Sequence, residues 1–178
     1  MLIMEDDVDT LIADLTCDDV IACQKARRKL VAMGSLAVER LVKELSSKKY
    51  WVRWETAKAL SQIGDKTAVN ALIDALEDEE FEIRWLAAEA LINIGQDSLE
   101  PLLTALEDHG DKSIFLRRGA HHVLHDMKRG DLDKILKPVM VAVEDMEPHI
   151  EVPPIAKKAL DTLRTHRMPE PQDANQRR

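Results

Sequence analysis

The chain has 178 residues, a net charge of −8 and 45% hydrophobic residues, as expected of a single globular domain that does not bind nucleic acid through bulk charge. Only 3% of the residues are aromatic, so the core has to be built from aliphatic side chains, which argues against a β-sandwich or barrel. No apolar run approaches the roughly 18 residues that cross a bilayer, and the acidic start MLIMEDDVDT lacks the basic region of a signal peptide.

A repeat of about thirty residues runs along the chain. The segment WVRWETAKALSQIG (51–64) recurs thirty-one residues later as EIRWLAAEALINIG (82–95). Glycines and leucines keep the same step: Gly34, Gly64 and Gly95, and Leu30, Leu60 and Leu91. A fixed period with helical apolar spacing inside each unit predicts an all-α fold, an α-solenoid.

Each unit is predicted to contain two helices, A and B, within a single domain of residues 1–166. The five expected units are 5–34, 35–64, 65–95, 96–129 and 130–166. The expected A helices are 5–16, 35–46, 66–77, 97–107 and 131–144, and the expected B helices are 21–33, 51–63, 82–94, 114–128 and 154–166. The glycines should end B helices in a left-handed conformation, and the leucines, with Leu124, should be buried at equivalent positions. Residues 167–178 are polar and proline-broken, which predicts a disordered tail.

The motif Val-Arg, two alanines, Ala-Leu and Ile-Gly in residues 51–107 resembles the HEAT-like repeat of phycobilisome lyases. The resemblance is clear at 21–50 and 108–128 and weak at 131–166. It implies a right-handed superhelix of about five HEAT-like repeats whose B helices line the concave surface. Such repeats serve many unrelated functions, so the motif identifies a repeat class and not an activity.

One arginine position recurs in three B helices, at Arg53, Arg84 and Arg117. In the family that this chain resembles, this arginine usually pairs with carboxylates of neighbouring turns, here Asp78, Glu80 or Asp108. We therefore expect a structural role between repeats, with anion binding along the groove as the alternative.

All six aromatic residues lie in 50–54, 81–85 or at position 115. Tyr50 and Phe81 occupy equivalent positions and are expected to pack into the joints as N-terminal staples. Trp54 and Trp85 lie off the apolar stripes, so their indoles are expected side by side on one exposed face. Exposed tryptophans beside arginine are typical of binding hot spots; the alternative is that each indole merely covers the neighbouring helix.

Charge is divided unevenly between the expected helices. The five B helices hold 13 Lys or Arg and 5 Asp or Glu, a net of +8, which leaves −16 for the rest of the chain. A basic groove would attract an acidic protein or peptide, although lysine and arginine also favour helix ends for local reasons. The residues predicted to bind a partner are Trp54, Trp85, Lys58, Arg118 and Arg28.

His121 and His125 lie one turn apart on one helix, which is a spacing that metal sites use. No carboxylate or cysteine pattern supplies further ligands, and the two cysteines, Cys17 and Cys23, form no Cys-x-x-Cys motif. We therefore expect no metal, no other cofactor and no catalytic residue.

These patterns favour a monomeric, cytoplasmic, non-enzymatic scaffold that binds an acidic protein or peptide and no membrane. One alternative is a phycobilin or tetrapyrrole lyase-like, or chaperone-like, subunit acting with a partner. A deoxyhypusine hydroxylase-like enzyme is disfavoured because the chain has no His-Glu dipeptide. A second alternative is a nucleic-acid-binding HEAT-like protein, disfavoured because Glu55, Glu82 and Glu89 would interrupt a phosphate-binding track.

Overall fold

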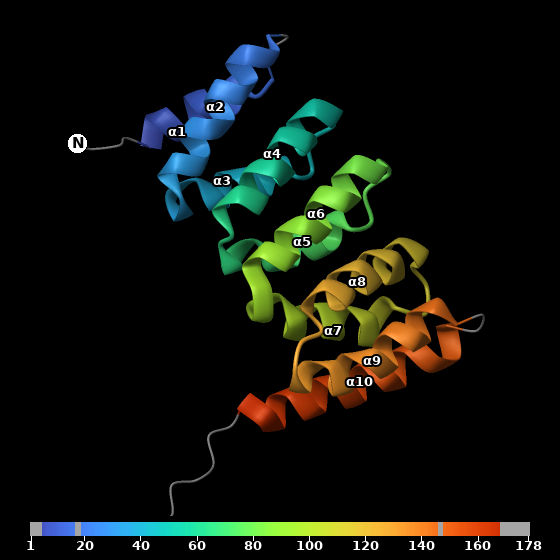
Figure 1. Ribbon diagram of the computed structural model, residues 1–178. Coiled ribbons are helices and arrows are strands. Elements are labelled where there is room, and N and C mark those ends of the chain that lie inside the picture. The colour runs from blue at the N-terminus through green and yellow to red at the C-terminus, as the bar shows by residue number, and fades with distance from the viewer. Residues whose placement is uncertain (1–4, 17–18, 146–147, 168–178) are drawn as a thin grey trace, which may run out of the picture.

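A computed structural model describes residues 5–16, 19–145 and 148–167, and in these ranges the chain is helical and has no strand. Figure 1 shows a stack of helical hairpins along one axis. The α-helices are α1 (Glu5–Asp14), α2 (Val20–Met33), α3 (Ser35–Glu44), α4 (Tyr50–Ile63), α5 (Val69–Ala75), α6 (Phe81–Ile94), α7 (Leu99–His109), α8 (Ile114–Met127), α9 (Asp131–Glu144) and α10 (Pro148–Arg167). The short 3₁₀ helices Lys66–Ala68 and Gly95–Ser98 precede α5 and α7. The predicted all-α solenoid is confirmed.

The glycines that end the first three B helices all have positive φ, but only Gly64 has the left-handed conformation that was predicted for all three. Gly64 is left-handed, with φ 67° and ψ 27°. Gly34 and Gly95 combine positive φ with ψ of −133° and −142°, in a region that only glycine populates. These turns therefore require glycine for a backbone reason.

The repeated leucines form the central line of the core. Leu30, Leu60, Leu91 and Leu124 are at most 1% exposed, so the register taken from the sequence is confirmed. The alanines beside them, such as Ala57 and Ala87, are fully buried as well. Small side chains at these positions let neighbouring helices stack closely, which is how a chain with few aromatic residues fills its core.

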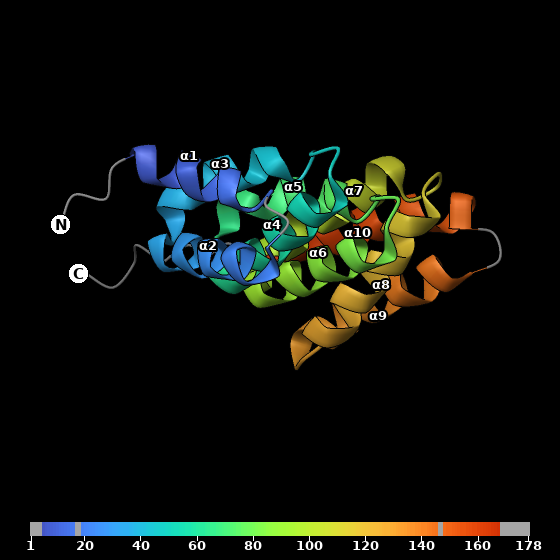
Figure 2. The same cartoon turned by 90° about the horizontal axis from the view of Figure 1, so that it is seen from above.

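The helices form two rows, seen from above in Figure 2. Row A contains α1, α3, α5, α7 and α10, and row B contains α2, α4, α6, α8 and α9. The first four hairpins place their first helix in row A and their second in row B, as expected. The fifth hairpin is reversed, because α9 packs on α8 and α10 packs on α7.

This reversal corrects the assignment of 131–144 as an A helix and 154–166 as a B helix. Polar contacts join the reversed helices to their rows. His121 Nε2 lies 3.0 Å from Glu144 Oε1 and links α8 to α9, while the ion pairs Lys157–Glu107 and Arg164–Glu100 link α10 to α7 at 3.2 and 2.6 Å. The last repeat therefore closes the stack in a different way from the others.

The last helix also begins six residues earlier than expected, at Pro148, and continues through Pro153 and Pro154. Val152 is fully buried, and its side chain lies against Gly110 at the end of α7. Burial of this early turn offsets the cost of proline inside the helix. Most of the expected tail, 168–178, lies outside the described residues, and Arg167 ends α10. No helix in the described ranges is long and apolar enough to cross a membrane.

Candidate functional site

An exposed aromatic surface lies at the N-terminal ends of three neighbouring row B helices. We define it as Tyr50, Trp51 and Trp54 of α4, Phe81 and Trp85 of α6, and Phe115 of α8. Four of these side chains are large and open to solvent: Trp51 is 65% exposed, Phe81 61%, Trp85 47% and Phe115 37%. The sequence predicted that both Tyr50 and Phe81 pack into the joints. Phe81 is exposed instead, and only Tyr50 of the two is partly buried.

Within α4, the aromatic rings pack on one another. The Trp51 ring lies 5.1 Å from Tyr50 and 6.0 Å from Trp54, edge to face in both cases. Lys58 Nζ lies 4.3 Å above the Trp54 ring, a cation–π contact one turn along the helix. Trp54 is thus partly covered by its own helix.

Trp54 and Trp85 occupy equivalent repeat positions, but no ring contact joins them in the described structure. Trp85 instead packs on the next helix, with its ring 4.4 Å from the His122 ring of α8. Phe81 lies 6.2 Å from Trp85 on the other side. Each indole therefore packs with different neighbours, and the expectation that the two indoles stand side by side stays a prediction.

A cleft of about 170 Å³ opens between α6 and α8, and its walls come from the aromatic surface. Its lining residues are Phe81, Arg84, Trp85, Ala88, Phe115, Arg118, Gly119 and His122. The Arg84 guanidinium lies 4.1 Å above the Phe115 ring, and His122 Nε2 is 2.9 Å from Glu89 Oε1. The cleft is lined by the guanidinium groups of Arg84 and Arg118 together with aromatic side chains, and no carboxylate is among its lining residues.

The recurrent arginine closes the turn before its own helix in all three repeats. Arg53 donates to the Ser47 carbonyl at 3.0 Å, Arg84 to the Asp78 carbonyl at 2.7 Å and Arg117 to the Gly110 carbonyl at 2.9 Å. These bonds satisfy carbonyls that the short turns would otherwise leave unpaired. The shared role of the arginine at this position is therefore to stabilise the turn before its own helix.

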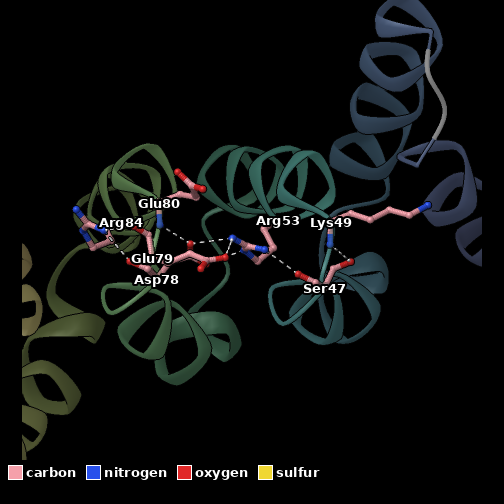
Figure 3. Close-up of polar contacts among 7 residues, drawn as sticks. All are labelled: Ser47, Lys49, Arg53, Asp78, Glu79, Glu80 and Arg84. Atoms are coloured by element: carbon pink, nitrogen blue, oxygen red, sulfur yellow. Dashed lines mark hydrogen bonds and ion pairs between the residues drawn. The ribbon is translucent and has the colours of Figure 1, made fainter.

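Arg53 also reaches the next repeat, as Figure 3 shows. Its Nε and Nη2 donate to the two Asp78 oxygens at 2.7 and 3.1 Å, and Nη2 lies 3.2 Å from Glu79 Oε1. This hydrogen bond to Asp78 raises the pKa of Arg53. Asp78 also accepts from the Glu80 backbone N–H at 2.9 Å, at the start of α6.

Arg84 and Arg117 make no ion pair within the described structure, which corrects the expectation of one carboxylate partner for each arginine. Asp78 lies in the turn after α5, which ends at Ala75, whereas α7 continues to His109 and keeps Asp108 on an exposed helix surface. The longer helix removes the carboxylate that would have neutralised Arg84. Glu80 contributes only its backbone N–H to this network.

A buried ion pair between α2 and α4 was not foreseen. Arg27 Nε lies 2.7 Å from Glu55 Oε2, with both side chains at most 8% exposed, and Arg27 Nη1 donates to Gln62 Oε1 at 2.9 Å. Neither Arg27 nor Glu55 is therefore available to a ligand. The residues alone could not reveal the pair, because they lie 28 positions apart.

The basic character of row B is weaker than expected. With α9 in place of α10, the row holds 11 Lys or Arg and 7 Asp or Glu, a net of +4. Arg28 and Arg118 are exposed and Lys58 is half-buried, so the predicted cations remain accessible. The excess positive charge of row B lies on α2, which has four Lys or Arg and no acidic residue, and the cations that line the cleft are Arg84 and Arg118.

His121 and His125 have rings 6.1 Å apart on α8, and His121 binds Glu144 of α9. No group of three or more metal-ligating side chains occurs among the described residues. The visible role of His121 is to join α8 to α9.

Residues 38–124 match the model of a family described as HEAT repeats. Among solved structures, the chain is similar to one in the complex of CpcE and CpcF of phycocyanin lyase from Nostoc sp. PCC7120, with 23% identity over 86% of this chain and 98% of that chain and a TM-score of 0.53. An engineered protein of the Northeast Structural Genomics Consortium has 22% identity over 89% of this chain and 79% of that chain, with a TM-score of 0.45. No curated protein matches the sequence.

At these identities, the likeness to solved structures is one of fold alone. Together with the family match and the two rows of stacked hairpins, it confirms the HEAT-like repeats recognised in the sequence. The family match covers residues 38–124, and the same hairpin geometry continues into α1 and α2 before it. We conclude that residues 38–124 are HEAT repeats and that the described chain is an α-solenoid of such hairpins.

Proposed function

We propose that this chain is a non-enzymatic, cytoplasmic binding subunit that acts together with a protein partner, held against the aromatic surface of α4, α6 and α8. The observation that carries the proposal is the exposure of four large aromatic side chains, Trp51, Phe81, Trp85 and Phe115, on consecutive helices. Large exposed apolar side chains gathered on neighbouring helices mark interaction sites in proteins that otherwise cover such surface.

The charge pattern supports an acidic partner. Arg28, Lys58 and Arg118 lie on row B with exposed or half-exposed side chains, on a chain whose net charge is −8. Tryptophan and arginine are the residues most enriched in binding hot spots, whereas cations outside the centre mainly steer the encounter. We therefore assign the affinity to Trp54 and Trp85, and orientation and association rate to the cations.

The phycocyanin lyase structure adds support for a subunit that works with another protein, since that chain is in a complex of CpcE and CpcF. It also raises a second candidate function, a lyase-like or chaperone-like subunit that handles a tetrapyrrole bound to its partner. This candidate is favoured by a fold likeness covering 98% of that chain. It is tested by titrating the chain with a free bilin: a saturable change in the bilin absorption spectrum supports it, and an unchanged spectrum refutes direct bilin binding.

Nucleic acid remains the less favoured ligand. Glu55 is buried against Arg27 and no longer interrupts a basic track, but Glu82 and Glu89 lie between the α4 and α8 cations at the solvent surface. Phosphate binding would need a continuous run of cations.

The proposal is tested by isolating a partner from native lysate with the tagged chain, identifying it, and measuring its affinity as a purified protein. Trp85→Ala should weaken binding by about thirtyfold, since a hot-spot truncation costs about 2 kcal/mol or more. Lys58→Ala should instead slow association and reduce its dependence on salt. The matched control is Leu36→Ala on α3, which removes a side chain 68% exposed in row A.

Affinities of Trp54→Ala and Trp85→Ala equal to wild type would refute the proposal. An equal loss in Leu36→Ala would also refute it, because the effect would then not be specific to the aromatic surface.

A further inference from the structure

We infer that the cleft between α6 and α8 binds a segment of the partner in which one large apolar side chain is flanked by side-chain carboxylates. This inference rests on the proposed function and specifies the chemistry that the aromatic surface recognises. It is carried by the size of the cleft, the nature of its walls and the unneutralised charge at its rim.

The size of the cleft selects a single side chain. Its volume is about 170 Å³, whereas pockets for drug-sized ligands measure about 300–1,000 Å³. Phe81, Trp85 and Phe115 contribute aromatic wall, and Ala88 leaves space between them. An aliphatic or aromatic side chain fits this space, and a whole organic cofactor does not.

The charge at the rim selects carboxylates. Arg118 is exposed and has no ion pair or hydrogen bond within the described structure. Arg84 uses Nη1 for the carbonyls of Asp78 and Glu79, and its Nε and Nη2 have no acceptor in the same ranges. Two guanidinium groups with free N–H donors beside an apolar wall match carboxylates, which accept such bonds in pairs.

The cleft differs from the preceding joint in the charge of its repeated arginine. Arg53 is the equivalent of Arg84, but Asp78 and Glu79 neutralise it and it is only 6% exposed. At the next joint the longer helix α7 keeps Asp108 away from Arg84. Arg84 lies over Phe115 instead, and its charge remains directed at the cleft.

The cleft is tested with short peptides blocked at both ends, so that every carboxylate belongs to a side chain. The probes are acetyl-Gly-Glu-Leu-Glu-Gly-amide and two matched peptides, one with Gln in place of both Glu residues and one with Ala in place of Leu. Binding is followed by the indole N–H signals in ¹H–¹⁵N spectra of the full chain, with the Trp85 signal assigned from Trp85→Phe. We expect the first peptide to shift the Trp85 signal to saturation and both matched peptides to bind at least tenfold more weakly.

Variants separate the cleft from general attraction between charges. Arg118→Gln should weaken the first peptide at least tenfold, while Lys29→Gln, the same change at an exposed cation on α2, should leave its affinity within twofold. Because both side chains are exposed, both variants should keep the helical circular dichroism of the wild type. The inference is overturned if the three peptides bind within threefold of one another, or if Arg118→Gln binds as wild type does.

Failure here can be told apart from failure of the proposed function. If the peptide does not bind but Trp85→Ala still loses the protein partner, the carboxylate chemistry is wrong and the interaction surface remains. If the peptide binds and the tryptophan variants keep the partner, the cleft is a peptide site and the proposed function fails.

Discussion

Replacing Asp78 with Asn should destabilise the joint between the second and third repeats strongly, because it removes the charge opposite a buried guanidinium. Arg53 Nε and Nη2 lie 2.7 and 3.1 Å from the two Asp78 oxygens, and the side chains are 8% and 10% exposed. Water therefore cannot replace the lost charge. The neutral amide also turns an N–H₂ group toward one of the guanidinium donors.

The magnitude follows from what remains after the substitution. Removal of one partner of a buried ion pair costs about 3–5 kcal/mol. Glu79, 3.2 Å from Arg53 Nη2, retains part of the compensation, and the amide oxygen of Asn can still accept the Glu80 N–H bond, so this turn contact is kept. We expect Asp78→Asn to lower the free energy of unfolding by about 3 kcal/mol.

The assay is urea unfolding of the wild type, Asp78→Asn, Arg53→Met and the double variant, followed by circular dichroism. The coupling energy of the cycle should be about 2 kcal/mol, and it should persist at 1 M salt because the pair is shielded. Glu79→Gln is the matched control: its side chain is 80% exposed, so its loss should stay below about 1 kcal/mol. A coupling energy below about 0.5 kcal/mol, or equal losses for Asp78→Asn and Glu79→Gln, would refute the reasoning.

Three further predictions concern other joints. Leu91→Ala should cost about 2–5 kcal/mol in urea unfolding, because a fully buried side chain leaves a cavity that closes only in part; a loss below about 1 kcal/mol would mean that the repeat register is wrong. The pKa of Asp65 lies below its ordinary value of 3.8, chiefly because Ser35 donates to it; its contribution to stability is present above that value and lost as pH falls through the lowered pKa, so unfolding midpoints of wild type and Asp65→Asn should differ at pH 7 and converge once the pH is below the lowered pKa. Gly110→Ala should lower the melting temperature, because the new Cβ would clash with the Leu106 carbonyl oxygen and would lie 2.5 Å from Val152 Cγ1; an unchanged melting temperature would show that neither contact restricts this position.

Local sequence determined the helices and the register of the repeat. The apolar stripe of each helix, the glycine after each of the first three B helices and the step between Leu60 and Leu91 all depend on residues close in the chain, and the structure keeps them. The aromatic positions were visible for the same reason, because every aromatic residue lies near the start of a B helix. The exposure of Trp85 was expected from its place off the apolar stripe, whereas that of Phe81 was not visible, since Phe81 could equally have packed into the joint.

Only the tertiary structure decided which row each helix joins and which charges remain free. An apolar stripe buries the same face of α9 and α10 whether the neighbour is α7 or α8, so the pattern along these helices cannot fix their positions. Contacts with residues tens of positions earlier in the chain fix them, and they place α9 in row B and α10 in row A. The same holds for charge: Arg53 and Arg84 are equivalent in sequence, yet one is neutralised and the other is free, because the length of helix α7 sets where the next carboxylate lies.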